Sequence, residues 1–388
     1  MGGEQSALDC TSVIACSSLR EPGRSSAGSS LCVLPHKHAQ RITPGQYQVG
    51  YRLYSPYSWL MSETYRSRGR GPLDRLDQRI ACALQVDGRA SWRYIAEVLG
   101  ESERTVTRRG TKLVGDRAVT IAARPRSRSN TIVGAHCELG QSRIVARAFA
   151  QRGDSFLVHI LTGTPECVVL LDCSRERLGE LVFEDLPGIR GLINTSTQPV
   201  LRHTHTISRW RPDVLTDVEV RALTGDRRDE TEGDGTANVF RDKADDLLLQ
   251  ALATDGRRSI DELSRLTGLS DTTVRRRVER MRRDGDLVVR AIVEPALLGL
   301  PVEAVLWVTA KPTEVESVSQ ELGRSPFARY VSVIVGDRQI MAIVAMPSEA
   351  ALYEFVTRSS WLGNVHSVDT AIILETYKRG GAITGTGS

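Results

Sequence analysis

Features that would identify several other protein classes are missing from this sequence of 388 residues. No apolar run approaches the roughly 18 residues that a membrane-spanning helix needs, so no membrane association is expected. The seven cysteines have no paired spacing, which argues against a disulfide framework and favours a reducing, cytoplasmic location. The formal net charge of +4 is too small to indicate a nucleic-acid partner by itself.

Patterns typical of enzymes and metal sites are also scarce. No Gly-rich phosphate loop and no Ser/His/Asp arrangement stands out. His203 and His205 would share one face of a strand, but no closed Cys/His spacing appears around them. The other candidate ligands in the same region are His136, His159, Cys167 and Cys173. We therefore expect no metal, no cofactor and no enzymatic activity.

What the sequence does contain is a cluster of arginines in SDTTVRRRVERMRRDGDLV, residues 270–288. Val274, Val278 and Met281 recur at intervals of four and three residues, so they line one face of an α-helix. Ser270 stands where an N-cap belongs, and Asp284 and Gly285 stand where a helix should end. This amphipathic helix should expose its basic residues, namely Arg275, Arg276, Arg280, Arg282 and Arg283.

Two shorter helices are predicted before it. The first, in 244–257, ends at Asp255-Gly256, and the second, in 259–268, opens with a capping box of Ser259 and Glu262. This order predicts a helix-turn-helix whose third helix enters the DNA major groove, with the strand that follows as its wing. Three short helices also occur in domains that bind no nucleic acid, but arginines on the presented helix favour DNA.

The same pattern occurs earlier, over 73–119. Asp87-Gly88-Arg89 returns as Asp255-Gly256-Arg257, and Arg108-Arg109 returns as Arg276-Arg277, each 168 positions later. Gapless matching of this kind indicates an internal repeat. Gly110 stands where the second copy has Val278, and a glycine inside a helix costs about 1 kcal/mol relative to alanine. The first of the two basic helices is therefore predicted to be the weaker one.

A strand, a helix, two strands, a helix and a strand follow each helix-turn-helix, in 126–223 and in 291–380. This β-α-β-β-α-β order is that of the ferredoxin-like unit, a four-stranded antiparallel sheet with both helices on one face. The other face of each sheet is apolar and has no partner inside the unit. The predicted fold class is α+β: a tandem duplication of a winged helix-turn-helix followed by a ferredoxin-like βαββαβ domain, with the two sheets pairing as a pseudo-dimer.

The repeated pattern resembles the leucine-responsive/asparagine-regulator (Lrp/AsnC) family of transcriptional regulators. The family's motif, "DGR" followed by S…LA…LG.S..TV.RR…L, is met closely by Ser102, Thr105-Val106 and Arg108-Arg109, and again by Ser270, Thr273-Val274 and Arg276-Arg277. The resemblance implies a sequence-specific regulator that binds double-stranded DNA and senses an amino acid or related small molecule. One chain would form an intramolecular pseudo-dimer, and such pseudo-dimers would build higher homo-oligomers. Sirohaem decarboxylases, which resemble Lrp/AsnC proteins, are the alternative from another class.

Two sets of residues are the candidate sites. Near the start of the second basic helix, Thr272, Thr273, Arg275 and Arg276 are the expected base readers, with Arg280 and Arg283 on the DNA backbone. The first copy offers Arg104, Thr107, Arg108 and Lys112. The family's effector loop, roughly Gly-x-x-Asp, corresponds to Gly163 through Glu166 and to Gly336, Asp337 and Gln339. Gln339 supplies no counter-charge to a ligand ammonium, so an effector site and a pair of plain hairpin turns both stay open.

The remaining segments are predicted as follows. Residues 1–70 are rich in Ser, Gly and Arg without periodicity and are expected to be disordered or an over-extended start, since Met61 precedes the first helix closely. Residues 224–242 are the expected linker. The domain bounds are 71–125 and 243–290 for the helix-turn-helix units, 126–223 and 291–380 for the ferredoxin-like domains, and 381–388 for the tail.

Overall fold

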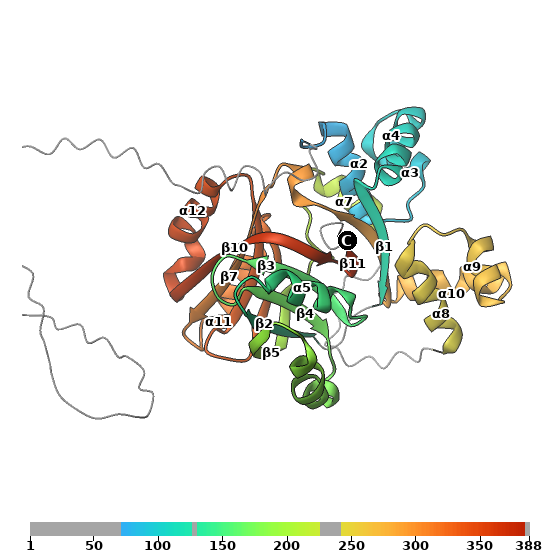
Figure 1. The fold of residues 1–388 in the computed structure, drawn as a ribbon. Coiled ribbons are helices and arrows are strands. Elements are labelled where there is room, and N and C mark those ends of the chain that lie inside the picture. The colour runs from blue at the N-terminus through green and yellow to red at the C-terminus, as the bar shows by residue number, and fades with distance from the viewer. Residues whose placement is uncertain (1–70, 126–129, 226–241, 385–388) are drawn as a thin grey trace, which may run out of the picture. The chain divides into compact units, whose positions relative to one another are not determined.

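The computed structural model describes residues 71–125, 130–225 and 242–384 (Figure 1). The predicted disordered segment 1–70 and most of the predicted linker lie outside these residues. The described chain contains two helical trios and two units of mixed strands and helices, in the predicted order. No helix in these described ranges is long and apolar enough to cross a membrane.

The first helical trio consists of α2 (Arg75–Val86), α3 (Trp92–Leu99) and α4 (Glu103–Gly115). The side chains of Asp74, Ser91 and Ser102 cap their amino ends by accepting a backbone N–H two or three residues into each helix. Gly100 ends α3 with a φ of 68°, a left-handed conformation that glycine adopts without steric cost. The core residues of the trio are Ile80, Leu84, Ile95, Val106 and Leu113, all at most 5% exposed.

The second trio repeats this plan with α8 (Lys243–Thr254), α9 (Ile260–Thr267) and α10 (Asp271–Arg283). The predicted capping box of Ser259 and Glu262 is present, and Ser270 caps α10 as expected. Val274, Val278 and Met281 are buried at 0%, 3% and 1% exposure, which confirms the predicted apolar stripe.

Gly110 has a packing role that its helix position did not reveal. A Cβ added there would overlap the ring of Trp92, so the indole occupies the space a larger side chain would need. Helix α4 runs unbroken through Gly110. Trp92, the first residue of α3, therefore fills the space that a side chain at position 110 would occupy.

The strand predicted after each trio is present, but the prediction that it forms a wing is wrong. β1 (Val119–Pro125) and β6 (Leu287–Val293) pair with each other, antiparallel, from Val119 opposite Val293 to Pro125 opposite Leu287. A wing would be a hairpin within one trio, whereas this two-stranded ribbon joins the two trios. Its apolar residues, among them Ile121 and Val289, enter the same core cluster as both trios, so burial across the halves outweighs hairpin formation within one half.

Two ferredoxin-like sheets follow the predicted order. The first contains β2 (Asn130–Cys137), α5 (Ser142–Gln151), β3 (Ser155–Leu161), β4 (Cys167–Asp172) and β5 (Leu192–His205). The second contains β7 (Val302–Ala310), α11 (Val315–Gly323), β8 (Ala328–Ile334), β9 (Ile340–Met346), α12 (Glu349–Arg358) and β10 (Val365–Arg379). The strand orders are β5-β2-β4-β3 and β10-β7-β9-β8, as in a ferredoxin-like sheet.

The first unit departs from the prediction at its second helix. Residues 175–188 form a chain of short turns instead of one α-helix: η1 (Arg175–Arg177), α6 (Leu178–Glu180), the π-helical η2 (Leu181–Asp185) and η3 (Leu186–Gly188). Pro187 lies inside this stretch and cannot donate a helical hydrogen bond. Leu181 and Leu186 are nevertheless buried, so the segment still covers its sheet.

Smaller elements connect these parts. They are α7 (Asp217–Thr224), η4 (Pro295–Leu298), η5 (Ser360–Asn364) and β11 (Ala382–Ile383). Thr216 and Glu219 form a capping box on α7. This helix lies against the first trio, because Arg79 bonds Glu219 at 2.5 Å and the Tyr94 hydroxyl donates to the Ala222 carbonyl at 2.7 Å.

The two ferredoxin-like sheets meet along two edges and across one face. β10 pairs antiparallel with β3, and β5 pairs antiparallel with β8. One core cluster combines apolar side chains from both sheets, including Phe156, Leu170, Trp307, Tyr330 and Ile373. Both sheets thus contribute apolar side chains to one buried cluster.

Candidate nucleic-acid interface

Helix α10 divides its arginines between solvent and its own trio. Arg275, Arg276 and Arg283 are exposed, and within the described part of the chain they make no hydrogen bond or ion pair. Thr272 is exposed at the first turn, and the Thr273 hydroxyl lies 2.9 Å from the capping Ser270 Oγ. The exposed guanidiniums retain their full hydrogen-bonding capacity for a ligand.

The other arginines of α10 are tied to carboxylates. Arg277 and Arg280 both bond Asp245, at 2.9 and 2.6 Å, and the Asp245 side chain is only 2% exposed. Arg277 also reaches Asp242 at 2.8 Å. The structure therefore places Arg280, predicted to contact the DNA backbone, in an ion pair that holds α10 against α8. Its side chain is still 43% exposed, so one edge faces solvent.

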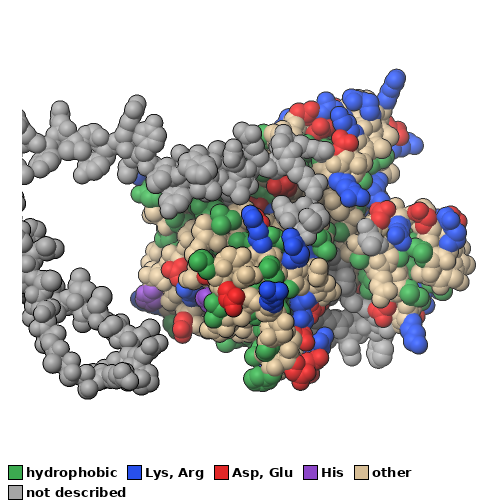
Figure 2. Space-filling view, in the orientation of Figure 1, with side chains coloured by type: hydrophobic (Ala, Val, Ile, Leu, Met, Phe, Trp, Pro, Cys, Tyr) green, Lys and Arg blue, Asp and Glu red, His purple; other side chains and the backbone are tan. Residues whose placement is uncertain are grey.

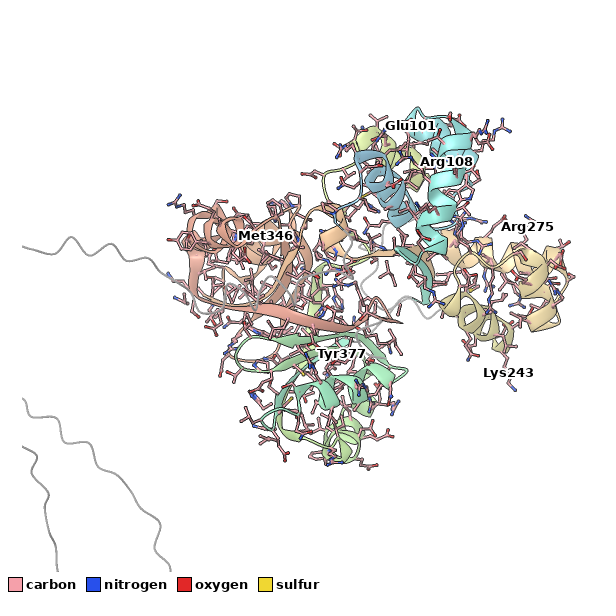
Figure 3. The ribbon with its side chains drawn as sticks, turned by 45° about the horizontal axis from the view of Figure 1, so that its top comes forward. Glu101, Arg108, Lys243, Arg275, Met346 and Tyr377 are labelled. Carbon is pink, nitrogen blue, oxygen red and sulfur yellow. The ribbon has the colours of Figure 1, made fainter. Side chains whose placement is uncertain are left out.

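Helix α4 presents a matching but smaller basic face. Arg104, Arg108 and Lys112 are exposed, four residues apart, so they share one side of the helix; Thr107 beside them is half-buried. None of these four side chains makes a hydrogen bond or ion pair within the described ranges. Figure 3 marks Arg108 on α4 and Arg275 on α10, and Figure 2 shows basic side chains projecting from the trios.

An ion pair inside the first trio repeats the one around Asp245. Arg109 bonds Asp74 and Asp77, and these three residues lie 168 positions before Arg277, Asp242 and Asp245. The hydrogen bond from Arg109 holds the pKa of Asp74 below its ordinary value. In each trio, an arginine at the equivalent position therefore holds the third helix against the first helix.

The two trios are joined by a reciprocal arginine clasp, which we define as Arg89 and Arg257 with the carbonyls they bind. Arg89 donates to the carbonyls of Gly256 and Arg258 at 2.7 and 3.0 Å. Arg257 donates to those of Gly88 and Ala90 at 3.0 and 3.1 Å, and its guanidinium lies 4.4 Å from the centre of the Trp92 ring. Burial lowers the pKa of both guanidiniums.

Glycine is required beside each arginine of the clasp. A Cβ on Gly88 would lie 2.9 Å from the backbone nitrogen of Arg290, and one on Gly256 would lie 2.8 Å from Val289 Cγ1. The Gly88 and Gly256 N–H groups donate to Val289 and Ile121 carbonyls at 2.9 and 3.0 Å. The sequence shows this motif as a repeat, but local spacing does not indicate its role, because its partners belong to the other copy.

One further bond crosses between the trios. Arg282 of α10 bonds Asp87 of the first trio at 2.6 Å, so it does not lie on the free basic face as predicted. Together with the clasp, this bond connects the second third helix directly to the first trio.

The predicted effector turns have their acceptors already engaged. Glu166 Oε2 accepts the Cys137 backbone N–H at 3.2 Å, and Gln339 Oε1 accepts the Ala310 N–H at 3.1 Å. Gly163 and Gly336 have φ values of 83° and 129°, as tight turns require. Asp337 is exposed. The equivalent bonds show that Glu166 and Gln339 hold the turn to the neighbouring strand.

Histidines that the structure describes contact neighbouring side chains of the two sheets. His203 contacts Asn130 and Tyr330, and His159 contacts Thr376. No group of three or more His, Cys, Asp or Glu side chains that could hold a metal ion occurs within the ranges that the structure describes. Burial lowers the pKa of His205 to about 4, with nearby arginines adding to the effect.

Comparison with known proteins gives the following matches. The sequence model of the AsnC-type helix-turn-helix domain matches residues 73–114 and 242–282, and that of the Lrp/AsnC ligand binding domain matches 303–383. An uncharacterised HTH-type transcriptional regulator of Pyrococcus abyssi is 30% identical over 37% of this chain and 91% of its own length. The regulator LrpA of the same organism is 28% identical over 35% of this chain and 99% of its own length.

Two solved structures are similar to parts of this chain. The structure of E. coli AsnC is 25% identical and covers 35% of this chain and 94% of that chain, with a TM-score of 0.33. The siroheme decarboxylase NirDL, solved with an iron-uroporphyrin III analogue, is 12% identical and covers 79% of this chain and 93% of that chain, with a TM-score of 0.50.

Proposed function

The chain belongs to the Lrp/AsnC family of DNA-binding transcriptional regulators, and we propose that it binds DNA through two unlike third helices, α4 and α10. The observation that carries the proposal is the free basic face on each helix. Arg104, Arg108 and Lys112 are exposed on α4, and Arg275, Arg276 and Arg283 are exposed on α10. Cations without an internal partner are available to phosphates and base edges.

The two faces differ at matched positions. Arg104 corresponds to Thr272 and Thr107 to Arg275, whereas Arg108 and Arg276 are the same residue, each pair 168 positions apart. Base readout depends on which side chains stand near the start of the third helix. We therefore propose that Thr272, Thr273, Arg275 and Arg276 recognise one half-site, and that Arg104, Thr107 and Arg108 recognise a different one. Lys112 and Arg283 are assigned to phosphates.

Selection of bound duplexes from a random library tests this proposal. The expected product is an imperfect palindrome with unlike half-sites, and binding should weaken steeply with salt because phosphate contacts release counterions. The slope of log affinity against log salt should change by about 0.9 for each phosphate contact. Recovery of two identical half-sites, equally sensitive to changes in α4 and α10, contradicts the assignment.

We further propose that one chain is the counterpart of a family dimer. The observations that support it are the β3–β10 and β5–β8 pairings, the shared core between the sheets and the β1–β6 ribbon. All of these join the first half of the chain to the second. Higher homo-oligomers would then be built from such chains.

A small-molecule effector of the amino-acid class is proposed for the turn of the second unit. Asp337 is exposed beside Gly336 and offers a carboxylate to a ligand ammonium. Gln339 and Glu166 are assigned to holding the strands instead. A thermal-shift screen of amino acids on the wild type and on Asp337→Asn tests this, since a specific ligand should raise the melting temperature of the wild type alone.

The alternative from another class is an activity like that of the siroheme decarboxylase, whose structure spans both halves of this chain. That likeness concerns the fold. Absorbance of the purified protein separates the two functions, because a decarboxylase of this kind is expected to retain a coloured tetrapyrrole, whereas a regulator should be colourless and bind DNA.

A further inference from the structure

Two cysteine thiols face each other inside the first ferredoxin-like unit. Cys137 ends β2 and Cys167 begins β4, and their sulfurs are 3.9 Å apart. Both thiols are free, with residue exposures of 7% and 0%. The Cys167 sulfur also lies 3.5 Å from the Ser142 carbonyl at the start of α5.

The second unit has no such pair at the corresponding place. Glu166 bonds the backbone N–H of Cys137 just as Gln339 bonds that of Ala310, which matches Cys137 with Ala310. The residue after Glu166 is Cys167, and the residue after Gln339 is Ile340. Because alanine and isoleucine fill the same core positions in the second unit, packing alone does not require two thiols here.

The thiol pair lies beside an exposed turn that contacts the other unit. Thr162, Gly163 and Thr164 are exposed, and they lead directly to Glu166 and Cys167. The Thr162 N–H donates to the Ile372 carbonyl, and the Ile372 N–H donates to Thr162 Oγ1, each at 2.9 Å. The turn next to the thiols is therefore part of the seam between β3 and β10.

We propose that Cys137 and Cys167 form a dithiol oxidation site, converted to a disulfide by a hydroperoxide. The Cys137 thiolate attacks the peroxide oxygen, which releases water or an alcohol and leaves a sulfenic acid. The Cys167 thiol then attacks that sulfur and a second water leaves. Two thiols lose two electrons and two protons in total, the peroxide is reduced, and a dithiol reductant reverses the step.

The environments of the two sulfurs divide these roles. The hydrogen bond between the two thiols holds the pKa of the Cys137 thiol below its ordinary value. The same hydrogen bond, together with burial, raises the pKa of Cys167. Since the thiolate is the nucleophile, Cys137 reacts first and Cys167 resolves the intermediate.

Closing the bond needs a small movement with a defined direction. A disulfide brings the sulfurs to about 2.05 Å, so they must approach by about 1.9 Å. Cys137 is the last residue of β2, and the pairing of β2 with β5 shifts register at His136 and Cys137, so the end of the strand is where the backbone can move. The approach also draws Cys167 away from the Ser142 carbonyl and disturbs the turn at the seam.

The experiment uses the full chain carrying Cys10→Ser, Cys16→Ser and Cys32→Ser, which leaves Cys82, Cys137, Cys167 and Cys173. The reduced protein is treated with a small excess of hydrogen peroxide, the remaining thiols are alkylated, and the digest is analysed by mass spectrometry. The expected result is one Cys137–Cys167 linked peptide and a protein about 2 Da lighter. Dithiothreitol should restore both thiols.

Matched variants make the result decisive. Cys173→Ser, a buried cysteine of the same unit, should oxidise like the parent. Cys137→Ala and Cys167→Ala should each form no disulfide. The proposal is overturned if peroxide yields only sulfinic acid on Cys137, links other cysteines, or leaves the pair reduced while an arsenical that bridges neighbouring dithiols still binds it.

Amide hydrogen exchange at Thr162 and Ile372 should quicken on oxidation, and unchanged protection overturns the coupling to the seam.

Discussion

The arginines of α10 perform two different tasks although they are neighbours in sequence. Arg277 and Arg280 neutralise the buried carboxylate of Asp245, whereas Arg275, Arg276 and Arg283 project into solvent. The division follows the helical periodicity, since positions near the Val274/Val278/Met281 stripe face the trio and the others face away. Mutating the exposed arginines should therefore change DNA affinity, whereas breaking the ion pairs with Asp245 should change the free energy of unfolding.

Replacing Arg275 and Arg276 together by alanine should lower DNA affinity by more than tenfold and leave the melting temperature unchanged. A bidentate base contact contributes about 1–3 kcal/mol, and neither side chain has a hydrogen-bond or ion-pair partner to lose among the residues that the structure describes. Fluorescence anisotropy with the selected duplex measures the effect. The control is Arg358→Ala on α12, another exposed arginine, in the second ferredoxin-like unit; equal losses in both variants would refute the assignment.

Asp245→Asn should lower the free energy of unfolding by about 1–3 kcal/mol, because it removes the buried negative charge that two guanidiniums share. Asp77→Asn is the matched change in the first trio, where the side chain is 23% exposed rather than 2% and water can replace part of the interaction. Urea titrations of both variants measure the difference. An equal or larger loss in Asp77→Asn would contradict the argument from burial.

Acid should destabilise the protein through its buried histidines. Burial lowers the pKa of His159 well below its ordinary value and that of His205 to about 4. The unfolded chain binds protons near pH 6.5 while the folded chain stays neutral, so stability is highest above that pH and falls as the pH drops toward 4. The slope of unfolding free energy against pH should become shallower in His205→Gln, and an unchanged slope would show that other groups control it.

At the scale of elements, the trios that contain α4 and α10 are connected by hydrogen bonds to backbone carbonyls as well as by a shared core. In the clasp, Arg89 and Arg257 each donate hydrogen bonds to backbone carbonyls of the opposite trio, and β1 pairs with β6. Charged hydrogen bonds from a planar guanidinium fix direction as well as distance. The separation of α4 and α10 is thereby held by elements outside the proposed DNA-binding faces.

The double variant Arg89→Lys, Arg257→Lys should relax the preference for one spacing between half-sites. Lysine keeps the charge but cannot make two parallel bonds. The measurement compares the selected duplex with one lengthened by about five base pairs, half a helical turn. Wild type should discriminate strongly and the variant weakly, while an exposed control, Arg265→Lys on α9, should match wild type. Undiminished discrimination in the variant would rule out this role for the clasp.

At the scale of the whole molecule, each ferredoxin-like unit depends on the other for the cover of its apolar face. Phe156, Leu170 and Ile132 of the first sheet pack with Trp307 and Ile343 of the second in one cluster. An isolated sheet would expose this face together with two unpaired edges, and such surfaces drive association.

A fragment of residues 243–388 should consequently dimerise or aggregate when expressed alone. Removing the first half uncovers β8 and β10 along their outer edges, and a second copy offers the matching edges. Light scattering across a concentration series gives the mass. A fragment that stays a stable monomer at high concentration would show that the face tolerates water and that the internal pairing is dispensable.

The sequence by itself determined the features that depend on neighbours along the chain. Capping residues, the buried stripe of α10, the strand order of both units and the repeat of the helix-turn-helix all follow from local spacing, and the structure confirms them. Tertiary structure alone decided which polar groups meet. Arg282 bonds a residue 195 positions away, and Arg89 one 167 positions away. The partner of β1 was likewise settled by burial across the halves, because a strand's pattern encodes which face is apolar but not which strand will cover its edge.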